Sequence, residues 1–335
     1  MRIGFIGAGK VGCTLGKFMS IHGAAVTGYY DRDTEAAAEA ARFVSGETDE
    51  VSVFAHAESA AAQISAEQSP QVSTEQSAQI STEQATQISA EQSTQVYTSA
   101  QELIADSDLV FLTVPDGLIA RVCGEISAFD IKDKFICHCS GSISSREALA
   151  SAAVAGAYTY SIHPLFAVSD KFTTYSELAD AFFTLEGDPA RIGEMSDFLA
   201  KAGLKFQIID PAAKTKYHLA AVYGSNLICG LIGEAVQLLQ ECGFEEKDAV
   251  RALAPLIRGN VEHALEVGPA GALTGPVERG DVLTLQKHLG VMTEEEDKQL
   301  YRLLSRKLLE LAKMKHPDRD YEQLELFLSN DNLEN

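Results

Sequence analysis

RIGFIGAGKVG, residues 2–12, is the stretch that decides the fold. A short apolar run comes first, three glycines follow with the spacing G-x-G-x-x-G, and an apolar pattern of helical period then continues to Gly23. In a strand–turn–helix unit such glycines allow a tight turn, close approach of the backbone to a pyrophosphate, and close helix packing. The stretch therefore predicts a dinucleotide-binding turn; the alternative is a glycine-rich turn that binds nothing. The residues expected to contact the dinucleotide are Gly7, Ala8, Gly9, Lys10, Val11 and Gly12.

The second predicted strand, residues 24–30, is followed by two residues that favour different cofactors. Asp31 could accept hydrogen bonds from the ribose hydroxyls of NAD, whereas the adjacent Arg32 could pair with the 2′-phosphate of NADP. Asp31 stands at the usual strand-end position, so the sequence favours NAD slightly over NADP. The alternative for Asp31 is that it only caps the following helix.

Strands and helices alternate through residue 209, apart from one insertion. Further strands are expected at residues 95–98, 109–114, 134–139, 157–162, 181–185 and 205–209, with helices in most of the intervals. This alternation indicates an α/β fold with a parallel, doubly wound sheet. From Asp210, which suits an N-cap, and Pro211, which suits a first helical position, helices dominate. We therefore expect two domains, at residues 1–209 and 210–335, of which the second is all-helical.

Residues 64–95 consist of four similar octapeptides, ISAEQSPQ, VSTEQSAQ, ISTEQATQ and ISAEQSTQ. Apolar residues eight positions apart spiral around a helix, and one apolar side chain in eight cannot offset the ordering entropy of a strand. We therefore expect a flexible, acidic, low-complexity insertion at about residues 47–95. The alternative is a small β-solenoid or adhesive surface, which needs more closely spaced apolar positions.

The charge and hydropathy of the chain exclude some partners. The net charge is −21, and residues 43–120 contain no Lys or Arg. Nucleic-acid backbones and anionic membranes both require a basic face, so we expect neither as a partner. Residues 1–23 lack the apolar core of a signal peptide, and the most apolar stretch, residues 219–232, is shorter than the roughly 18 residues of a membrane span. We expect a cytoplasmic protein whose six cysteines are free thiols.

Several predicted strands end in polar residues at the edge where doubly wound sheets bind ligands. His163 ends one of them, and contact with a substrate and a structural role are equally open for it. The residues after two other strands are expected to line the cofactor cleft, and they are Val114, Pro115, Asp116, Ser140 and Gly141.

The segment Cys137–Cys139 has side chains that zinc prefers. Strand alternation, however, sends His138 to the face opposite its two cysteine neighbours, and no second ligand pair is close in sequence. We therefore expect buried thiols and no metal site.

The long helix expected at residues 211–240 carries the best catalytic candidates. On a helical projection Lys214, His218 and Ser225 share one face around Ala221. A lysine and a histidine four residues apart can supply a proton to a carbonyl or imine that receives a hydride, if burial brings their pKa values toward neutrality. The alternative is a solvated Lys214 in the first turn and a His218 that only packs.

A glycine-rich loop, LTGPVERGD at residues 273–281, contains one further candidate. Arg279 could bind a substrate carboxylate through both guanidinium nitrogens. The alternative is that Arg279 pairs with Asp281 and braces the turn.

Six motifs together, GAGKVG, TVPD, HCSG, SIHPL, KTKYHLAAVYGSN and LTGPVERGD, resemble the Rossmann-like proteins that carry a domain of unknown function 2520 at the C-terminus. That family is similar to pyrroline-5-carboxylate reductase, the deazaflavin-dependent NADP reductases, and the 6-phosphogluconate and β-hydroxyacid dehydrogenases. The resemblance implies an NAD(P) site on the N-terminal domain. It also implies an all-helical domain of the 6-phosphogluconate dehydrogenase C-terminal type that forms homodimers, and whose first long helix faces the nicotinamide.

In the β-hydroxyacid dehydrogenases this helix carries a catalytic Lys and, four residues later, an Asn. Lys214 matches the Lys by this resemblance, whereas His218 stands at the position of the Asn. Asn226, two turns later, is the asparagine that could contribute in its place.

The sequence thus favours an NAD(P)-dependent oxidoreductase that moves a hydride to or from a small, anionic carbonyl, imine or hydroxy-acid substrate. Lys214 would donate the proton, His218 and Ser225 would orient the substrate, and Arg279 would hold its carboxylate. Two alternatives stay open: a non-catalytic dinucleotide-binding sensor, and a structural or adhesive protein that acts through the octapeptide repeats.

Overall fold

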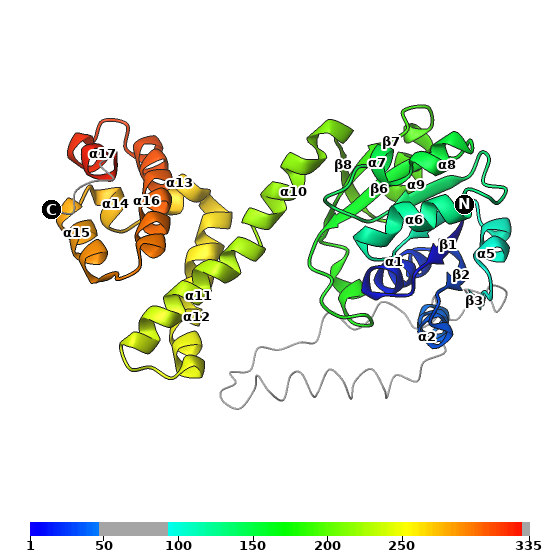
Figure 1. The fold of residues 1–335 in the computed structure, drawn as a ribbon, viewed down its shortest axis with the longest axis horizontal. Helices are drawn as coiled ribbons and strands as arrows, with labels where there is room; N and C mark the ends of the chain where they lie inside the picture. Colours follow the sequence, from blue (N-terminus) through cyan, green and yellow to red (C-terminus); the bar gives the residue numbers. More distant parts are fainter. Residues whose placement is uncertain (47–92, 330–335) are drawn as a thin grey trace, which may run out of the picture. The chain divides into compact units, whose positions relative to one another are not determined.

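The computed structural model describes residues 1–46 and 93–329, and the chain divides into two compact units, Met1–Ser225 and Asn226–Asn335 (Figure 1). The insertion expected at residues 47–95 lies outside the described residues, except for residues 93–95. The expected domain boundary lies near residue 210, whereas the two units divide after Ser225. Residues 210–225 therefore belong to the first unit, although the sequence assigned them to the second domain.

The first unit contains, among its described residues, a sheet of eight strands in the order β3-β2-β1-β4-β5-β6-β7-β8. The strand order reverses between β1 and β4, and doubly wound sheets bind ligands at such a switch point. The predicted fold class, an α/β doubly wound domain followed by helices, is confirmed. The strands are β1 (Arg2–Ile6), β2 (Ala25–Tyr30), β3 (Gln95–Val96), β4 (Leu109–Leu112), β5 (Phe135–His138), β6 (Tyr158–Leu165), β7 (Phe182–Gly187) and β8 (Lys205–Ile208).

One strand pair departs from the predicted parallel sheet, because β7 runs antiparallel to β6. Parallel neighbours need a crossover connection of a dozen or more residues, which is usually a helix. Between β6 and β7 the chain forms only a short 3₁₀ turn, η1 (Thr174–Glu177), so β7 returns directly alongside β6. In this ladder Ser161 pairs with Glu186, and His163 pairs with Thr184.

Helices cover both faces of the sheet, because the side chains of each buried strand alternate between them (Figure 1). On one face the rings of Tyr29, Phe5 and Phe111 stack with centroids 5.1 and 5.3 Å apart, in one cluster with residues of α1 and α2. On the other face Val110 and Leu112 pack with residues of α5, α6 and α8. The helices of this unit are α1 (Lys10–Ile21), α2 (Thr34–Ser45), α5 (Ala100–Asp106), α6 (Asp116–Ile126), α7 (Ser145–Ala148), α8 (Ala150–Val154), α9 (Ile192–Lys201) and α10 (Lys214–Tyr223).

The long helix expected at residues 211–240 is interrupted. Asp210 caps a 3₁₀ turn, η2 (Pro211–Ala213), by accepting from the Ala212 amide, and α10 then begins at Lys214. A turn at Gly224 and Ser225 separates α10 from α11 (Asn226–Glu241). Glycine and serine are both weak helix formers, which explains the break.

The stretch Pro211–Glu241 is nevertheless long and apolar enough to cross a membrane by length and composition, and among the described residues it is the one helical stretch of this kind. Its most apolar window has a mean hydropathy of 1.5, and 6% of that window is buried. The apolar stretch is therefore longer than the expected residues 219–232, because it runs through both α10 and α11.

The second unit is all-helical in its described part, as the sequence predicts. Its core gathers around Val277, Leu285 and Tyr321, together with residues from the two last helices. Besides α11, its helices are α12 (Glu246–Val267), α13 (Pro269–Ala272), α14 (Pro276–Arg279), α15 (Val282–Val291), α16 (Glu295–Lys315) and α17 (Glu322–Ser329).

Candidate functional site

The three glycines of the first turn have different roles. Gly7 has a φ of 109°, which favours glycine, and its amide donates to the Tyr30 carbonyl at 2.9 Å. A Cβ on Gly12 would lie 2.5 Å from Thr113 Oγ1 and 2.6 Å from the Gly7 carbonyl oxygen, so only glycine permits this packing. A Cβ on Gly9, the N-cap of α1, would meet no heavy atom within 4 Å. Gly9 therefore leaves open space at a helix N-terminus, which suits a pyrophosphate.

A cavity of about 490 Å³ opens beside this turn, at the ends of β1, β2 and β4. Residues of α5 and α6 close its other side. Two expected contacts point elsewhere: Lys10 Nζ donates to the Ser169 carbonyl at 2.6 Å, and Val11 packs against the core. The expected cofactor residues that do line the cavity are Gly7, Gly9, Asp31, Arg32, Val114 and Pro115.

The Asp31 carboxylate is already engaged by the main chain. Its Oδ2 accepts from the Ala8 amide at 2.7 Å, and its Oδ1 accepts from the Asp33 amide at 3.0 Å. The N-cap of α2 is Asp33, which excludes the alternative that Asp31 is the cap. Arg32, in contrast, is exposed and lines the cavity.

A second polar cluster lies on the β6–β7 pair. Ser161 and Glu186 are cross-strand partners, so their side chains lie side by side on one face of the sheet. Lys214, the first residue of α10, reaches both: its Nζ donates to Ser161 Oγ at 2.6 Å and lies 4.0 Å from Glu186 Oε1. The Glu186 carboxylate is fully buried and accepts from the Ser145 amide at 2.8 Å and from the Ser145 hydroxyl at 2.7 Å.

The neighbouring pair of the ladder, His163 and Thr184, receives a second side chain from α10. The Tyr217 hydroxyl lies 2.7 Å from His163 Nδ1. A Cβ on Gly141 would lie 2.6 Å from His163 Nε2 and 2.9 Å from His218 Cδ2. Both histidine rings therefore pack against Gly141. His218 on α10 thus lies close to His163 on β6.

Lys214 is buried, with 2% of its surface exposed, which excludes the alternative of a solvated side chain. Burial lowers the pKa of Lys214 to about 8, because the charged form is poorly solvated there. The nearby carboxylates of Glu186 and Asp116 act in the opposite direction and favour the ammonium form. Such a shifted lysine can release or take up a proton at slightly alkaline pH.

Two histidines near Lys214, His163 and His138, are neutral at physiological pH. Burial and the Lys214 charge lower the pKa of His163 to about 4, with His218 adding to the effect, and they lower the pKa of His138 to about 3. His138 is fully buried, and its Nδ1 accepts from the Ser140 amide at 3.1 Å. In the part of the chain that the structure describes, no group of three or more His, Cys, Asp or Glu side chains is arranged to hold a metal ion.

Two expected cofactor residues contact each other at the edge of the same unit. The Ser140 hydroxyl donates to Asp116 Oδ2 at 2.7 Å, and the Ser142 hydroxyl donates to the same oxygen at 3.1 Å. This links the first turn of α6 to the loop after β5. Asp116 and Ser140 thus lie on the same side of the unit as Lys214, whereas Val114 and Pro115 line the cavity.

Glu186 and Tyr217 are the site residues that the sequence reasoning missed. Tyr217 stands three residues after Lys214, so helical spacing alone places it on the same face. Glu186 is an acid near the end of the otherwise uncharged strand FFTLEG, and a charged residue there is a signal for a buried polar contact. Its partner could not be read from that pattern.

The three remaining expected residues are Ser225, Asn226 and Arg279. From the turn after α10, the Ser225 hydroxyl donates to the Ala221 carbonyl at 2.6 Å. Asn226 begins α11, and Arg279 is exposed at the end of α14, so both belong to the second unit. Their roles toward a substrate stay predictions.

In the loop around Arg279, the neighbouring residue Glu278 makes the hydrogen bonds that brace the loop. Glu278 accepts hydrogen bonds from His316 and Arg319, and these hold down the pKa of its carboxyl. Asp281 caps α15 by accepting from the amide and hydroxyl of Thr284. The loop is therefore braced mainly by Glu278.

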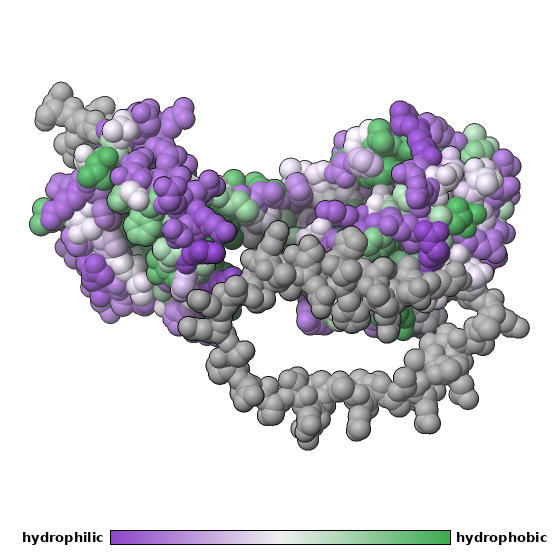
Figure 2. Space-filling view, turned by 90° about the horizontal axis from the view of Figure 1, so that it is seen from below, coloured by the Kyte–Doolittle hydropathy of each residue, from purple (hydrophilic) through white to green (hydrophobic). Residues whose placement is uncertain are grey.

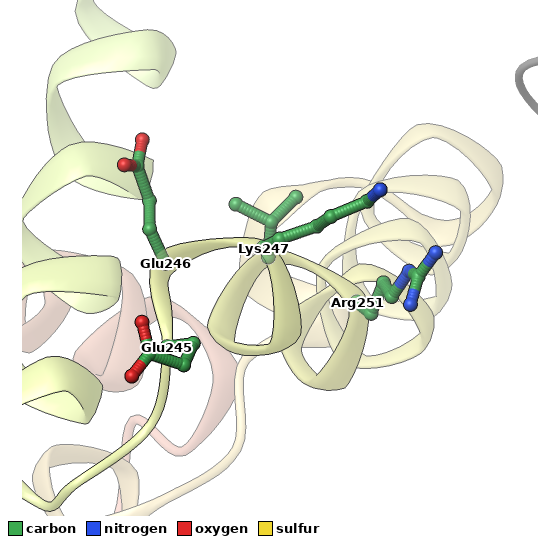
Figure 3. Close-up of a pocket in the computed structure, with 5 residues that line it drawn as sticks. Glu245, Glu246, Lys247 and Arg251 are labelled. Carbon is green, nitrogen blue, oxygen red and sulfur yellow. The ribbon is translucent and has the colours of Figure 1, made fainter.

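A further hollow, of about 550 Å³, lies at the start of α12 (Figure 3). Lys247 and Arg251 point to one side in this view, and Glu245 and Glu246 point away from them. All the lining residues come from the segment 245–251, so no distant parts of the chain converge there. The cleft and cluster of the first unit are the stronger candidates for a functional site.

Comparisons with known proteins agree with this fold. Residues 181–308 match the family model described as "Domain of unknown function (DUF2520)". A search of curated proteins finds no match. A solved structure of a protein from Thermotoga maritima is 20% identical, with a TM-score of 0.60 over 93% of this chain and 99% of that chain.

Two other solved structures have a similar fold. A protein from Bacteroides fragilis named "putative NADP oxidoreductase" is 19% identical, with a TM-score of 0.59 over 92% of this chain and 98% of that chain. A reductive aminase from Aspergillus terreus, solved in complex with NADPH and ethyl-5-oxohexanoate, is 12% identical, with a TM-score of 0.53 over 98% of this chain and 92% of that chain. The family resemblance is therefore confirmed: the chain is a Rossmann-like protein whose residues 181–308 match DUF2520.

Proposed function

We propose that this protein is an NAD(P)-dependent oxidoreductase that transfers a hydride to or from a small, anionic carbonyl, imine or hydroxy-acid substrate. The observation that carries the proposal is the presence, in one unit, of a glycine-lined cavity at the sheet's switch point and a buried lysine whose pKa is lowered to about 8. The solved structures with a similar fold include a reductive aminase bound to NADPH, which supports the cofactor class.

The dinucleotide would bind at the first turn, where the open space at Gly9 and the α1 N-terminus fits a pyrophosphate. When bound, the nicotinamide supplies or accepts the hydride. Lys214 would hold the proton that the substrate oxygen or nitrogen gains during reduction, and would take it back during oxidation. His163, fixed by Tyr217, and His218 would orient the substrate beside Gly141, with His163 as a neutral ring.

Nucleotide binding followed by a turnover screen tests this proposal. The purified protein is titrated with NADPH and NADH while nucleotide fluorescence is followed, and the absorbance of the bound nucleotide is then monitored with a panel of 2-oxo acids, cyclic imines and hydroxy acids. Binding with turnover supports the oxidoreductase. Binding without turnover on any substrate class favours the sensor, and absence of binding in a folded sample rejects both.

We further propose that Arg32 selects NADP over NAD. The two carboxylate oxygens of Asp31 already accept main-chain hydrogen bonds, whereas Arg32 lines the cavity as an exposed cation. Replacing Arg32 by alanine should weaken NADPH binding about 10-fold, which is ~1.4 kcal/mol, and leave NADH binding nearly unchanged. Fluorescence titration at constant salt measures both affinities.

Arg42→Ala is the matched control, because it removes the same charge from an exposed position on α2 that does not line the cavity. It should leave both affinities unchanged. Equal weakening of NADPH and NADH by Arg32→Ala, or tighter binding of NADH by the native protein, would contradict the role of Arg32.

We also propose that the protein forms a homodimer through its helical unit. Leu227, Leu231 and Leu238 of α11 are 45%, 41% and 46% exposed and recur at helical spacing. Leu231 and Leu238 also line a groove of about 350 Å³ with Leu300 and Leu304 of α16. In the space-filling view apolar patches appear between hydrophilic ones on this unit (Figure 2). Apolar surface of this kind is typical of an interface.

Replacing Leu231 by glutamate should convert the dimer to a monomer, because the charge would have to be buried at the interface. Sedimentation equilibrium measures the mass. The control is Gln240→Glu, which adds the same charge on the opposite side of α11 and should leave the dimer intact. A native protein that sediments as a monomer at all concentrations contradicts the proposal.

A further inference from the structure

Glu186 is a buried acid for which the proposed chemistry gives no role so far. Its side chain is 0% exposed, although an isolated carboxylate is strongly destabilised in such a place. Two hydrogen bonds from Ser145 hold both of its oxygens at the start of α7. Among the described residues, the cation within ion-pair distance of this carboxylate is Lys214, at 4.0 Å.

The β6–β7 ladder fixes this geometry. Ser161 and Glu186 face each other across the two strands, and Lys214 Nζ lies over them with a hydrogen bond of 2.6 Å to Ser161. Because Ser145 holds the carboxylate in place, Glu186 cannot turn away from the ammonium. The strand β6 thus supplies Ser161 as the hydrogen-bond acceptor for Lys214, and β7 supplies Glu186 as its counter-charge.

We propose that Glu186 is a positioning residue for the hydride transfer, which holds the Lys214 ammonium over Ser161 as its fixed counter-charge. This inference rests on the proposed role of Lys214 as proton donor. Glu186 acts through Lys214 and does not itself contact the reacting atoms.

The other groups that face Lys214 do not replace Glu186. Asp116 from α6 favours the ammonium form less strongly than Glu186 does. Burial raises the pKa of the Cys139 thiol, after β5, to about 12, so this group is uncharged here. His138 from β5 and His163 from β6 are neutral above pH 6, because their pKa values lie at about 3 and 4. The ring of Tyr217 lies 5.8 Å from Nζ, and burial raises the pKa of its hydroxyl. These two histidines and Tyr217 therefore do not change charge in the range from pH 6 to 9, in which Lys214 titrates.

The test compares pH–rate profiles of the native protein and Glu186→Gln. Lys214 can donate a proton only below its pKa, so reductive turnover in the native protein should fall as the pH rises through about 8. Without the negative charge the ammonium is less favoured, so this fall should occur at least about one pH unit lower in Glu186→Gln. NADPH affinity should stay the same, because Glu186 does not line the cofactor cavity.

Ser145→Ala is the matched control. It removes one of the hydrogen bonds to the same carboxylate but keeps the charge. It should lower thermal stability and leave the pH of half-maximal turnover in place. If both variants reduce turnover without moving that pH, Glu186 has only a structural role and the inference is overturned.

A readout that does not need activity separates this inference from the proposed function. In protein labelled with ¹³C at the lysine ε-carbon, the Lys214 signal is identified by its loss in Lys214→Arg and titrated by NMR. Its midpoint should lie near 8 in the native protein and lower in Glu186→Gln. An unchanged midpoint overturns the inference even if the enzyme turns over.

The native titration also decides the case in which Glu186→Gln does not fold. A native midpoint of about 5–6, as found for buried lysines, would show that Glu186 does not hold the ammonium and would overturn the inference. A midpoint near 8 supports it. If Glu186→Gln lowers the midpoint of the Lys214 titration but turnover does not need Lys214, the ion pair between these residues is confirmed and the proposed function fails.

Discussion

Replacing Lys214 by methionine should lower kcat by about 10²–10⁴-fold, the usual effect of removing a general acid. Methionine keeps a flexible chain of similar length but has no proton to give. The variant leaves Glu186 without its counter-charge, so stability should fall by roughly 3 kcal/mol. Steady-state turnover and NADPH titration, both at a temperature where the variant is folded, separate the loss of chemistry from a loss of cofactor binding.

Lys216→Met is the control for this experiment. Lys216 lies two residues further along α10 and is exposed, so it offers the same substitution without the buried contacts. Its kcat should match that of the native protein. Native-like turnover by Lys214→Met with intact NADPH affinity would remove Lys214 from the mechanism.

Replacing Gly9 by alanine should weaken NADPH binding roughly 100-fold, about 2.8 kcal/mol, while leaving the melting temperature of the nucleotide-free protein unchanged. A Cβ at this position meets no heavy atom of the chain within 4 Å, and the backbone there is extended, with φ −76° and ψ −173°. The methyl group would instead occupy space that the pyrophosphate needs. Nucleotide titration and thermal unfolding measure the two effects.

Gly12→Ala provides the opposite pattern in the same turn. Its Cβ would overlap Thr113 Oγ1 and the Gly7 carbonyl, so the nucleotide-free protein should lose about 1–3 kcal/mol of stability. If Gly9→Ala bound NADPH as tightly as the native protein, the turn would not hold a pyrophosphate, and the cofactor proposal would lose its main support.

Local sequence signals predicted the features that depend on local geometry. The glycine spacing at residues 7–12 predicted the first turn, and strand–helix alternation predicted the doubly wound sheet. The same holds for the N-cap at Asp210. Each of these depends on a few consecutive residues, and their backbone preferences are strong enough to be read directly.

The polar cluster could be predicted only in part, because it depends on strand pairing. Helical spacing identified Lys214 and His218, but the partner of Lys214 depends on the register of β6 against β7. That register is set by two strands distant in sequence, and an antiparallel pair was not expected there. The helical projection that placed Ser225 beside Lys214 assumed one continuous helix. The turn at Gly224 ends that helix before Ser225, so the projection does not apply to it.

The burial of Glu186 has a consequence for how the first unit folds. The carboxylate is enclosed by strands and a helix that all precede α10, whereas its counter-ion arrives with α10. A sheet that closed before α10 docked would surround an unpaired charge, at a free-energy cost of several kcal/mol. This cost is relieved only when α10 docks, because α10 carries the counter-ion Lys214. Docking of α10 is thus the step that commits the sheet to its final packing.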